Sequence, residues 1–322
     1  MMEKILSICV PTYNRSGYLE TLLENLRTQI RNFSLQDTVE VIVSDNASAD
    51  NTPDIAAKYA DIIRYHRNSE NIGPDANFLG LFEMAQGKYI WLPGDDDKVR
   101  PDIIKYILNM IAAHDLDYLY LKTAGPVIEA SDRGGERVSN VELLKTVNIF
   151  TTFMTSQVIR ASLVKANIEQ ARPLLGGFMA YYKIFLESLW SARCCVISSG
   201  REVFANDDNT GGYSFYRVWG TSVFDAYAAS PFAGNRDILK LMKQRMFCAL
   251  ILPITYKLRT GVKGFHFIGE KPEASMSKYF GGFLYTSIFA AYTRAPTWAL
   301  KPVNGVMKIV SSLLRRTSHS IS

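Results

Sequence analysis

The chain has 322 residues, of which 48% are hydrophobic and 21% charged, enough for one large domain with a sizeable core and a smaller second part. No stretch reaches the ~18 unbroken apolar residues of a membrane-spanning helix, which argues against an integral membrane protein. The net charge of +5 is uneven, because residues 236–322 hold 14 Lys and Arg against 3 Asp and Glu, whereas residues 1–235 hold 22 against 28. We therefore expect two parts with different roles, 1–235 and 236–322.

The four cysteines show no metal-binding spacing, and two of them, Cys194 and Cys195, are adjacent. This suits the reduced thiols of a cytosolic protein. No long apolar run precedes Pro11, so a secretory signal is not expected either.

The first 125 residues alternate between short hydrophobic runs and amphipathic segments. Strands are predicted at 4–10, 39–43, 62–66, 88–92 and 118–121. Helices are predicted from Ser16, as a possible N-cap, from Thr52, from Pro74 to about Ala85, and from Pro101. The helix after Ser16 has one apolar stripe, formed by Leu19, Leu22, Leu23, Leu26 and Ile30. This alternation predicts an α/β fold with a parallel, doubly wound sheet.

Beyond residue 125 the local signals weaken. Strands are expected at 154–160 and 194–198, with a helix at 176–190 between them. The chain after Arg236 is expected to be helical, and its segments are 238–256, 279–292 and 303–316. We therefore predict a first domain over 1–235, divided into halves at 125, and a C-terminal helical extension over 236–322.

Polar clusters follow three of the predicted strands, at Pro11–Asn14, at Asp45–Asn46 and at Asp95–Asp97. Right-handed crossovers bring the carboxyl ends of parallel strands to one edge of the sheet. Ligands of open α/β sheets bind at that edge. The three clusters are therefore expected to meet in one binding site.

Asp95, Asp96 and Asp97 are consecutive, and no basic residue intervenes before Lys98. Such carboxylates repel one another unless a positive group lies between them, and hard divalent cations take oxygen ligands of this kind. In extended backbone Asp95 and Asp97 point the same way, with Cα atoms roughly 6.5 Å apart. A metal ion with a diphosphate is one interpretation, and a solvated acidic turn that caps the next helix is the other.

Four ordered segments resemble the family 2 glycosyltransferases, which have the GT-A fold; these segments are 7–15, 41–50, 71–77 and 91–97. Residues 71–78 and 154–160 resemble in particular the abequosyltransferase-like branch of bacterial O-antigen enzymes. The resemblance is specific over 4–125 and moderate to about 220. It implies transfer of a sugar from a nucleoside-diphosphate sugar to a hydroxyl of a glycan in surface polysaccharide synthesis.

The resemblance also implies roles for individual residues. The donor nucleotide would contact Pro11, Tyr13, Asn14, Asp45, Asn46, Gly73, Asn77, Asp95 and Asp96. The metal, Mg²⁺ or Mn²⁺, would lie against Asp95 and Asp97 and neutralise the leaving diphosphate. Simpler structural roles exist for some of these residues: Tyr13 covering the core edge, Asp45 capping a turn, and Gly73 forming a turn before Pro74.

The general base has no clear candidate. Relatives place an acid at the start of the helix after the acceptor-side strand, but residues 176–183 contain no carboxylate. The abequosyltransferase-like branch has a histidine near Tyr182, and a tyrosine of pKa near ~10 is a poor base. Asp207 and Asp208 on a loop, and Glu187 one turn along the helix, are the candidates.

The C-terminal residues combine basic with aromatic and aliphatic side chains. This pattern favours amphipathic helices on an anionic membrane surface, where a polyprenyl-diphosphate-linked acceptor would be found. The predicted location is therefore cytoplasmic, peripheral on the inner face of the membrane, with no nucleic acid as partner. A helical subdomain packed on the core is the alternative. Other possible functions are a nucleotidyltransferase that makes the activated sugar and a non-catalytic nucleotide-binding protein.

Overall fold

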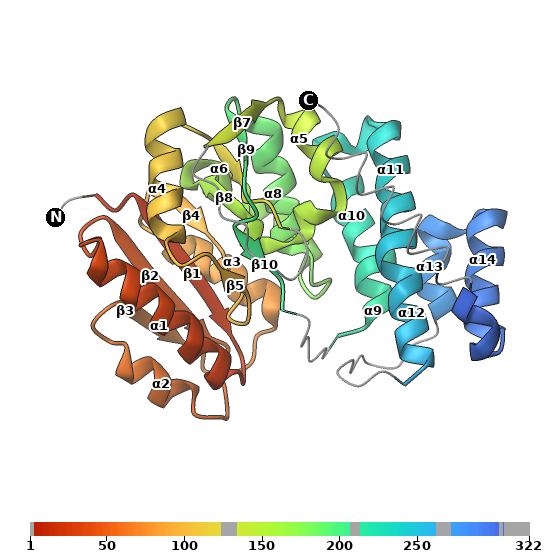
Figure 1. The fold of residues 1–322 in the computed structure, drawn as a ribbon, viewed down its shortest axis with the longest axis horizontal. Helices are drawn as coiled ribbons and strands as arrows, with labels where there is room; N and C mark the ends of the chain where they lie inside the picture. The colour runs from red at the N-terminus through yellow and green to blue at the C-terminus, as the bar shows by residue number, and fades with distance from the viewer. Residues whose placement is uncertain (1–2, 124–133, 207–212, 262–271, 303–304, 306–322) are drawn as a thin grey trace. The chain divides into compact units, whose positions relative to one another are not determined.

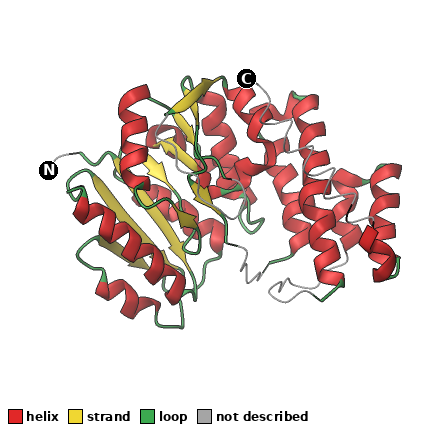
Figure 2. Cartoon of the chain, viewed as in Figure 1, coloured by secondary structure: helices red, strands yellow, loops and turns green. Residues whose placement is uncertain are grey.

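The computed structural model describes residues 3–123, 134–206, 213–261, 272–302 and 305. These residues form two compact units. The first contains residues up to 143 together with 150–206, and the second contains 144–149 together with the described residues after Asn206. Among the described residues, strands occur only in the first unit, and those from 213 onward are helices and turns (Figure 2).

The first unit is built on an eight-stranded sheet in the order β3-β2-β1-β4-β8-β6-β9-β7. The strands are β1 Leu6–Thr12, β2 Val39–Asp45, β3 Ile63–Arg67, β4 Tyr89–Trp91, β6 Tyr118–Tyr120, β7 Gly135–Val138, β8 Gln157–Arg160 and β9 Cys195–Ser198. Neighbours pair in parallel from β3 through β2 and β1 to β4, whereas β8 is antiparallel to β4 and β6 and β7 is antiparallel to β9. The predicted mostly parallel α/β sheet is confirmed.

Helices cover both faces of this sheet (Figure 1). One layer consists of α1 Ser16–Asn32, α2 Thr52–Lys58 and α4 Ile103–His114, and the other of α3 Pro74–Met84, α6 Ala161–Ala166 and α8 Ala180–Ser191. Two further helices are α5 Asn140–Val147 and α7 Ile168–Ala171. Helices on both faces bury the central strands completely, which is why those strands are hydrophobic at consecutive positions rather than alternately.

Helix α1 shows how the sequence pattern becomes packing. The whole predicted apolar stripe of this helix is buried in the core below the sheet. The expected N-cap was wrong, because Ser16 is the first helical residue and Arg15 precedes it as the cap. The Ser16 backbone N–H instead donates to Asp50 Oδ2 at 2.9 Å, so a distant carboxylate replaces the local cap. Helix α2 likewise begins at Thr52, and Asn51 is its cap.

A second, two-stranded antiparallel sheet, which the sequence pattern did not indicate, lies close to the carboxylate cluster in sequence. It pairs β5 Lys98–Val99 with β10 Val203–Phe204. Directly after β5, the buried guanidinium of Arg100 contacts the buried carboxylate of Glu202 at 2.9 Å. This pair connects the residues after Asp97 to the strand that leads to Asn206.

The second unit is helical. Its elements are α9 Phe215–Arg217, α10 Val223–Ala228, α11 Arg236–Met246, α12 Leu252–Arg259, α13 Pro272–Phe280 and α14 Phe283–Arg294. Arg245 on α11 donates to the carbonyl oxygens of Lys145 and Thr146 at 3.4 and 3.1 Å, which ties the short segment 144–149 to this unit. None of the described helices combines the length and the hydrophobicity that crossing a bilayer requires.

The division of the chain differs from the predicted boundary after 235. Residues 213–235 lie in the helical unit because α9 and the π-helical turn Val218–Ser222 pack against α13. The helix expected over 303–316 lies outside the described residues, apart from residue 305.

Candidate active site

The carboxylate cluster lies at the carboxyl edge of the sheet, as predicted. Asp95 is only 5% exposed, and its Oδ2 accepts a hydrogen bond from the hydroxyl of Thr12, the last residue of β1, at 2.8 Å. The guanidinium of Arg15 bridges Asp95 Oδ1 at 3.2 Å and Asp96 Oδ2 at 2.8 Å. The ends of β1 and β4 therefore meet, and one arginine neutralises part of the cluster's charge.

Asp97 is held by residues from the other half of the unit. Its Oδ2 accepts a hydrogen bond from the hydroxyl of Thr155, just before β8. That hydroxyl also accepts from the Gly94 backbone N–H at 2.9 Å, and the indole N–H of Trp91 donates to the Thr155 carbonyl oxygen at 2.8 Å. The backbone N–H of Asn206 is a further donor to Asp97. The acidic turn is thus fixed by surrounding structure and does not form a loose solvated cap.

Burial changes the acidity of two of these groups. Desolvation raises the pKa of Asp95 to about 6, against the opposing effect of the Arg15 charge. Desolvation also raises the pKa of Asp97 to about 7, with the Thr155 hydrogen bond lowering it and the charges of Asp96 and Asp95 raising it further. Both carboxylates are poorly stabilised as anions, so a cation beside them would be favourable.

The chemistry of the donor set fits a hard divalent cation. The cluster offers only carboxylate oxygens, which Mg²⁺ and Mn²⁺ accept as ligands. Both oxygens of Asp95 are already engaged by Thr12 and Arg15, so Asp97 is the better placed of the two predicted ligands. Within the described residues, no group of three or more His, Cys, Asp or Glu side chains is arranged to hold a metal. Substrate phosphates would have to complete the coordination, which is usual for Mg²⁺.

Gly94 leaves the space that the Asp97 carboxylate occupies. A Cβ atom at this position would lie 2.6 Å from Asp97 Oδ2 and 3.1 Å from its Cγ. We expect Gly94→Ala to displace this carboxylate and to lower turnover of a nucleotide sugar about 10- to 100-fold, as for a displaced metal-orienting group. Steady-state hydrolysis of the donor measures this effect.

Gly80→Ala is the matched control, because a Cβ atom at Gly80 on α3 would meet nothing within 4 Å. This variant should keep its activity and gain up to about 1 kcal/mol from helix propensity. Equal activity in both alanine variants would contradict the proposed importance of the Asp97 position.

The end of β2 forms the second part of the site. Asp45 is fully buried, and its carboxylate accepts from the Ser48 backbone N–H at 2.8 Å and from the Tyr65 hydroxyl at 2.6 Å. The Arg67 guanidinium lies 3.6 Å from the same carboxylate. Burial and Asp45 raise the pKa of Tyr65, so this hydroxyl stays a donor. Asp45 therefore orders its own loop, and its contact with a base or ribose stays a prediction.

A network of asparagine side chains joins β2 to the start of α3. Asn46 donates to Asn71 Oδ1 at 2.8 Å and accepts from Asn68 at 3.1 Å. Asn77 accepts from the Ser44 hydroxyl at 2.7 Å and from Asn68 at 2.9 Å. Between them, Gly73 has φ = 82°, a backbone conformation that favours glycine. These hydrogen bonds fix the positions of Asn46 and Asn77, which with Gly73 are the residues from the end of β2 to the start of α3 that were predicted to contact the donor.

The residues after β1 leave one aromatic ring accessible. Pro11 is buried within the strand, while Tyr13 is 44% exposed and free to stack on a planar ligand. Asn14 has φ = 54°, and this turn is held by its side chain, which accepts from the Ala49 backbone N–H at 2.7 Å. The structure therefore brings the Pro11–Asn14 and Asp45–Asn46 segments together, as the parallel pairing of Thr12 with Asp45 requires.

The predicted base candidates are not brought to this cluster by any described contact. Glu187 is buried on α8 and forms an ion pair with Lys183, one turn earlier. Asp207 and Asp208 lie outside the described residues.

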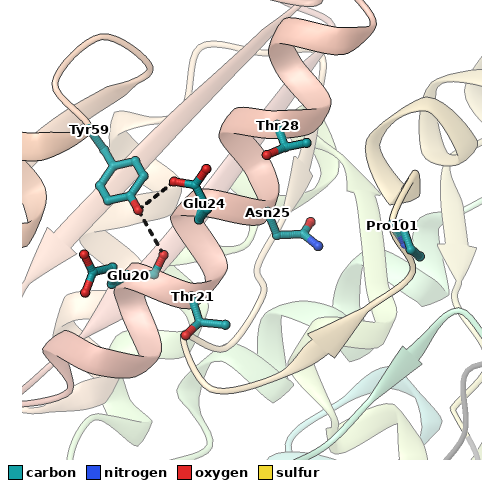
Figure 3. A pocket seen from close by; sticks show the side chains of 7 residues that line it. All are labelled: Glu20, Thr21, Glu24, Asn25, Thr28, Tyr59 and Pro101. Atoms are coloured by element: carbon teal, nitrogen blue, oxygen red, sulfur yellow. Dashed lines mark hydrogen bonds between the residues drawn. The ribbon is translucent and has the colours of Figure 1, made fainter.

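A pocket of about 600 Å³ lies elsewhere in the first unit, on the outer side of α1 (Figure 3). It is lined by Glu20, Thr21, Glu24, Asn25, Thr28, Tyr59 and Pro101. The Tyr59 hydroxyl donates to Glu24 Oε2 at 3.0 Å across its wall. None of the predicted donor or metal residues lines this pocket, so it has no part in the site described above.

A comparison with known protein families covers most of the residues that form the site described above. Residues 7–158 match the family described as Glycosyl transferase family 2. Over these residues, which are just under half of the chain, the sequence is similar to a family 2 glycosyltransferase domain. The matched segment contains β1 through β4, the carboxylate cluster and Thr155, so every part of the site except the Asn206 donor and the base candidates falls within the match.

Two curated bacterial relatives are similar to part of this chain. The chain is 43% identical over 119 residues to the abequosyltransferase RfbV of Salmonella typhimurium, covering 36% of this chain and 35% of the relative. It is 34% identical over 113 residues to the putative glycosyltransferase EpsH of Bacillus subtilis, covering 34% and 31%. Each match spans about a third of the length of the relative, and the predicted resemblance to the abequosyltransferase branch is confirmed over the aligned residues.

Solved structures share the fold over nearly the whole chain. The structure of S. aureus TarS 1–349 in complex with UDP-GlcNAc has a TM-score of 0.61 at 18% identity and covers 98% of this chain and 90% of that one. The mannosyltransferase PcManGT from Pyrobaculum calidifontis, in complex with GDP-Man and Mn²⁺, has a TM-score of 0.55 at 13% identity and covers 98% and 88%. The GT-A-type fold predicted from the sequence is therefore confirmed, with a helical region after it.

Sequence reasoning missed three residues that build the cluster. Thr12 and Arg15 stand within a segment that carried the family resemblance, which was the signal available, but no role followed from it. Thr155 also lies within a resembling segment, 154–160, but a threonine inside a predicted strand gave no reason to assign it a role. Only the antiparallel pairing of β8 with β4 places it beside Gly94 and Asp97.

Proposed function

We propose that the chain is a metal-dependent glycosyltransferase that transfers a sugar from a nucleoside-diphosphate sugar to a hydroxyl of a glycan. The observation that carries the proposal is the convergence of Thr12, Asp45 and the Asp95–Asp97 cluster on one sheet edge, within the segment similar to family 2. We propose a lipid-linked glycan of a bacterial surface polysaccharide as acceptor, because the chain resembles the abequosyltransferase-like branch of O-antigen enzymes and the helical unit is basic.

The proposed reaction forms one bond and breaks one. The acceptor oxygen bonds to the anomeric carbon of the donor sugar, the bond from that carbon to the diphosphate oxygen breaks, and the acceptor proton passes to a base. Bound Mg²⁺ or Mn²⁺ would neutralise charge on the leaving diphosphate. Asp97, oriented by Thr155, would hold the ion, while Arg15 keeps Asp95 and Asp96 in place and Tyr13 stacks on the nucleotide.

The base stays open among Asp207, Asp208 and Glu187. The ion pair with Lys183 counts against Glu187, because it already engages this carboxylate within α8. Asp207 or Asp208 is therefore the preferred proposal.

A thermal-shift panel of UDP-, GDP-, CDP- and dTDP-sugars, with Mn²⁺ or with EDTA, tests the proposed function. One nucleotide should stabilise the chain by about 2.7 kcal/mol at a hundredfold excess over its Kd, and EDTA should remove the effect. Release of nucleoside diphosphate should follow with that donor. Pyrophosphate released from a nucleoside triphosphate would indicate a nucleotidyltransferase instead, and binding without turnover on any acceptor would indicate a non-catalytic protein.

We also propose that the helical unit attaches to the inner face of the cytoplasmic membrane. Residues 213–261 and 272–302 contain 10 Lys and Arg against 3 Asp and Glu. Two aromatic side chains in this unit are largely solvent-exposed, Phe283 at 88% and Trp298 at 78%. Basic groups near an anionic leaflet contribute roughly 1 kcal/mol each, and exposed aromatics can insert at its boundary.

Replacing both aromatic side chains tests this attachment. We expect Phe283→Ala with Trp298→Ala to weaken binding to vesicles that contain phosphatidylglycerol by about tenfold or more, because insertion of each ring buries apolar area worth about 1.5–3 kcal/mol. Co-sedimentation at low salt measures the loss.

Trp190→Ala is the matched control, since Trp190 is 48% exposed but belongs to the first unit. This variant should bind the same vesicles as the unchanged chain does. Undiminished binding by the double variant would show that these aromatics take no part, and equal binding to neutral phosphatidylcholine would rule out the electrostatic contribution.

A further inference from the structure

A buried carboxylate from α3 occupies the start of α8, where the sequence of α8 itself provides no acid. Asp75 is 2% exposed, and its two oxygens accept from the backbone N–H groups of Phe178 at 2.7 Å and Ala180 at 3.0 Å. The N–H groups of Gly176 and Gly177 are also donors to it. Four backbone N–H groups of one loop thus converge on a single side chain more than 100 residues earlier in the chain.

The loop that Asp75 holds has an unusual backbone. Gly176 has φ = 82° and Phe178 has φ = 66°, the second in a region that a large side chain rarely adopts. Such a conformation costs of order 1–3 kcal/mol and persists only where surrounding contacts impose it. Hydrogen bonds to a charged acceptor are stronger than those between neutral groups. The hydrogen bonds to Asp75 can therefore hold the loop in this backbone conformation.

The same helical turn also reaches the donor side of the unit. Asn77, two residues after Asp75, accepts from the Ser44 hydroxyl at the end of β2 and donates to the Ser44 carbonyl oxygen at 3.1 Å. Behind this turn α3 and α8 pack through their rings, with Phe78 5.5 Å from Tyr181 and Phe82 6.3 Å from Phe185. The first turn of α3 is therefore a rigid connection between the end of β2 and loop 176–179.

We propose that Asp75 is a positioning residue that fixes loop 176–179 as the wall on which the acceptor hydroxyl is oriented. This inference rests on the proposed glycosyl transfer. Asp75 is not itself the base, because both its oxygens are occupied by N–H donors and the side chain is shielded from solvent. Its charge takes the place of a first-turn acid of α8, where the helix dipole favours an anion.

Asp75→Asn and Asp75→Ala test the proposal, with Asp54→Asn as control, because Asp54 is an exposed acid in the first turn of α2. The probes are the nucleotide sugar selected by the thermal-shift panel, water as acceptor, and a panel of octyl glycosides as sugar acceptors. We expect Asp75→Asn to lower kcat/KM for the glycoside about 100-fold, as for a misplaced reacting group, while donor hydrolysis and nucleotide stabilisation change less than about twofold.

Hydrogen–deuterium exchange gives a readout that does not need activity. The amides of Phe178 and Ala180 should exchange at least about tenfold faster in Asp75→Ala, with no change in the peptides of β1 and β2. Glycoside transfer at the unchanged rate, or a parallel loss of donor hydrolysis and transfer, would overturn the proposal. Exchange that stays slow at 176–180 would overturn it as well. Absence of any transfer or hydrolysis by the unchanged chain would instead count against the proposed function, and exchange would then still decide whether Asp75 anchors the loop.

Discussion

Asp97→Ala is expected to lower metal-dependent donor turnover about 10²- to 10³-fold, the scale seen when one electrostatic group of a transition state is removed. Asp97 is the carboxylate of the cluster that Arg15 does not contact in the described structure, and Thr155 orients it. The variant should also lose stabilisation by nucleotide plus Mn²⁺. Full turnover in the variant, or in an excess of EDTA, would disprove the metal role of Asp97.

The Asp97 carboxylate, which we expect to hold the metal, should also lower the stability of the metal-free chain near neutral pH. The folded chain keeps the Asp97 proton up to about pH 7, whereas the unfolded chain releases it near ~3.9. Unfolding therefore becomes easier as pH rises through this window, because the folded state must ionise a buried group. Without metal at pH 7.5, Asp97→Asn should raise the free energy of unfolding by about 1–2 kcal/mol, a value reduced for the partial exposure of the group.

Urea unfolding of Asp97→Asn and of the unchanged chain at pH 5 and pH 7.5 measures this gain in the free energy of unfolding. The gain over the unchanged chain should be larger at pH 7.5, and Mn²⁺ with nucleotide should stabilise only the unchanged chain. Asp37→Asn removes an exposed carboxylate and is the control, for which no comparable gain is expected. A gain that is equal at both pH values would contradict the assignment to Asp97 ionisation.

Arg100→Ala should be among the most destabilising single changes in the first unit. Arg100 is 3% exposed and Glu202 is fully buried, and their side chains meet at 2.9 Å while the Arg100 backbone N–H donates to the Glu202 carbonyl oxygen at 3.0 Å. Removing the guanidinium leaves a buried carboxylate without its countercharge, which costs about 3–5 kcal/mol. Because β10 leads to Asn206, whose N–H group reaches Asp97, activity should fall as well.

Two further variants test whether burial of the Arg100–Glu202 ion pair causes the loss of stability. Arg31→Ala breaks an ion pair whose members are 63% and 43% exposed, so it should cost less than about 1 kcal/mol. Arg100→Met with Glu202→Leu removes both charges and should recover part of the loss, because no buried charge is left unpaired. If Arg100→Ala cost no more than Arg31→Ala in chemical unfolding, the buried pair would not have the importance given to it.

Most of the sheet could be predicted from the sequence because its signals are local. A buried strand such as 39–43 is a hydrophobic run bounded by turn residues, and the stripe of α1 is visible as a spacing of three and four. The antiparallel insertion of β8 between β4 and β6 has no such signal, nor does the pairing of β5 with β10. Short strands of two to four residues carry too little pattern to reveal their partners.

Seven strands of the large sheet, the polar clusters at three strand ends and the resemblance to family 2 were all visible in the sequence. They were visible because each depends on residues close together in the chain. By contrast, the contact of Thr155 with Asp97 and the ion pair of Arg100 with Glu202, 102 residues apart, are visible only in the folded chain. The same holds for the hydrogen bond by which Asp75 anchors a loop 103 residues away. Such contacts form between chain segments that only the folded sheet brings together, and burial is what makes each of them energetically decisive.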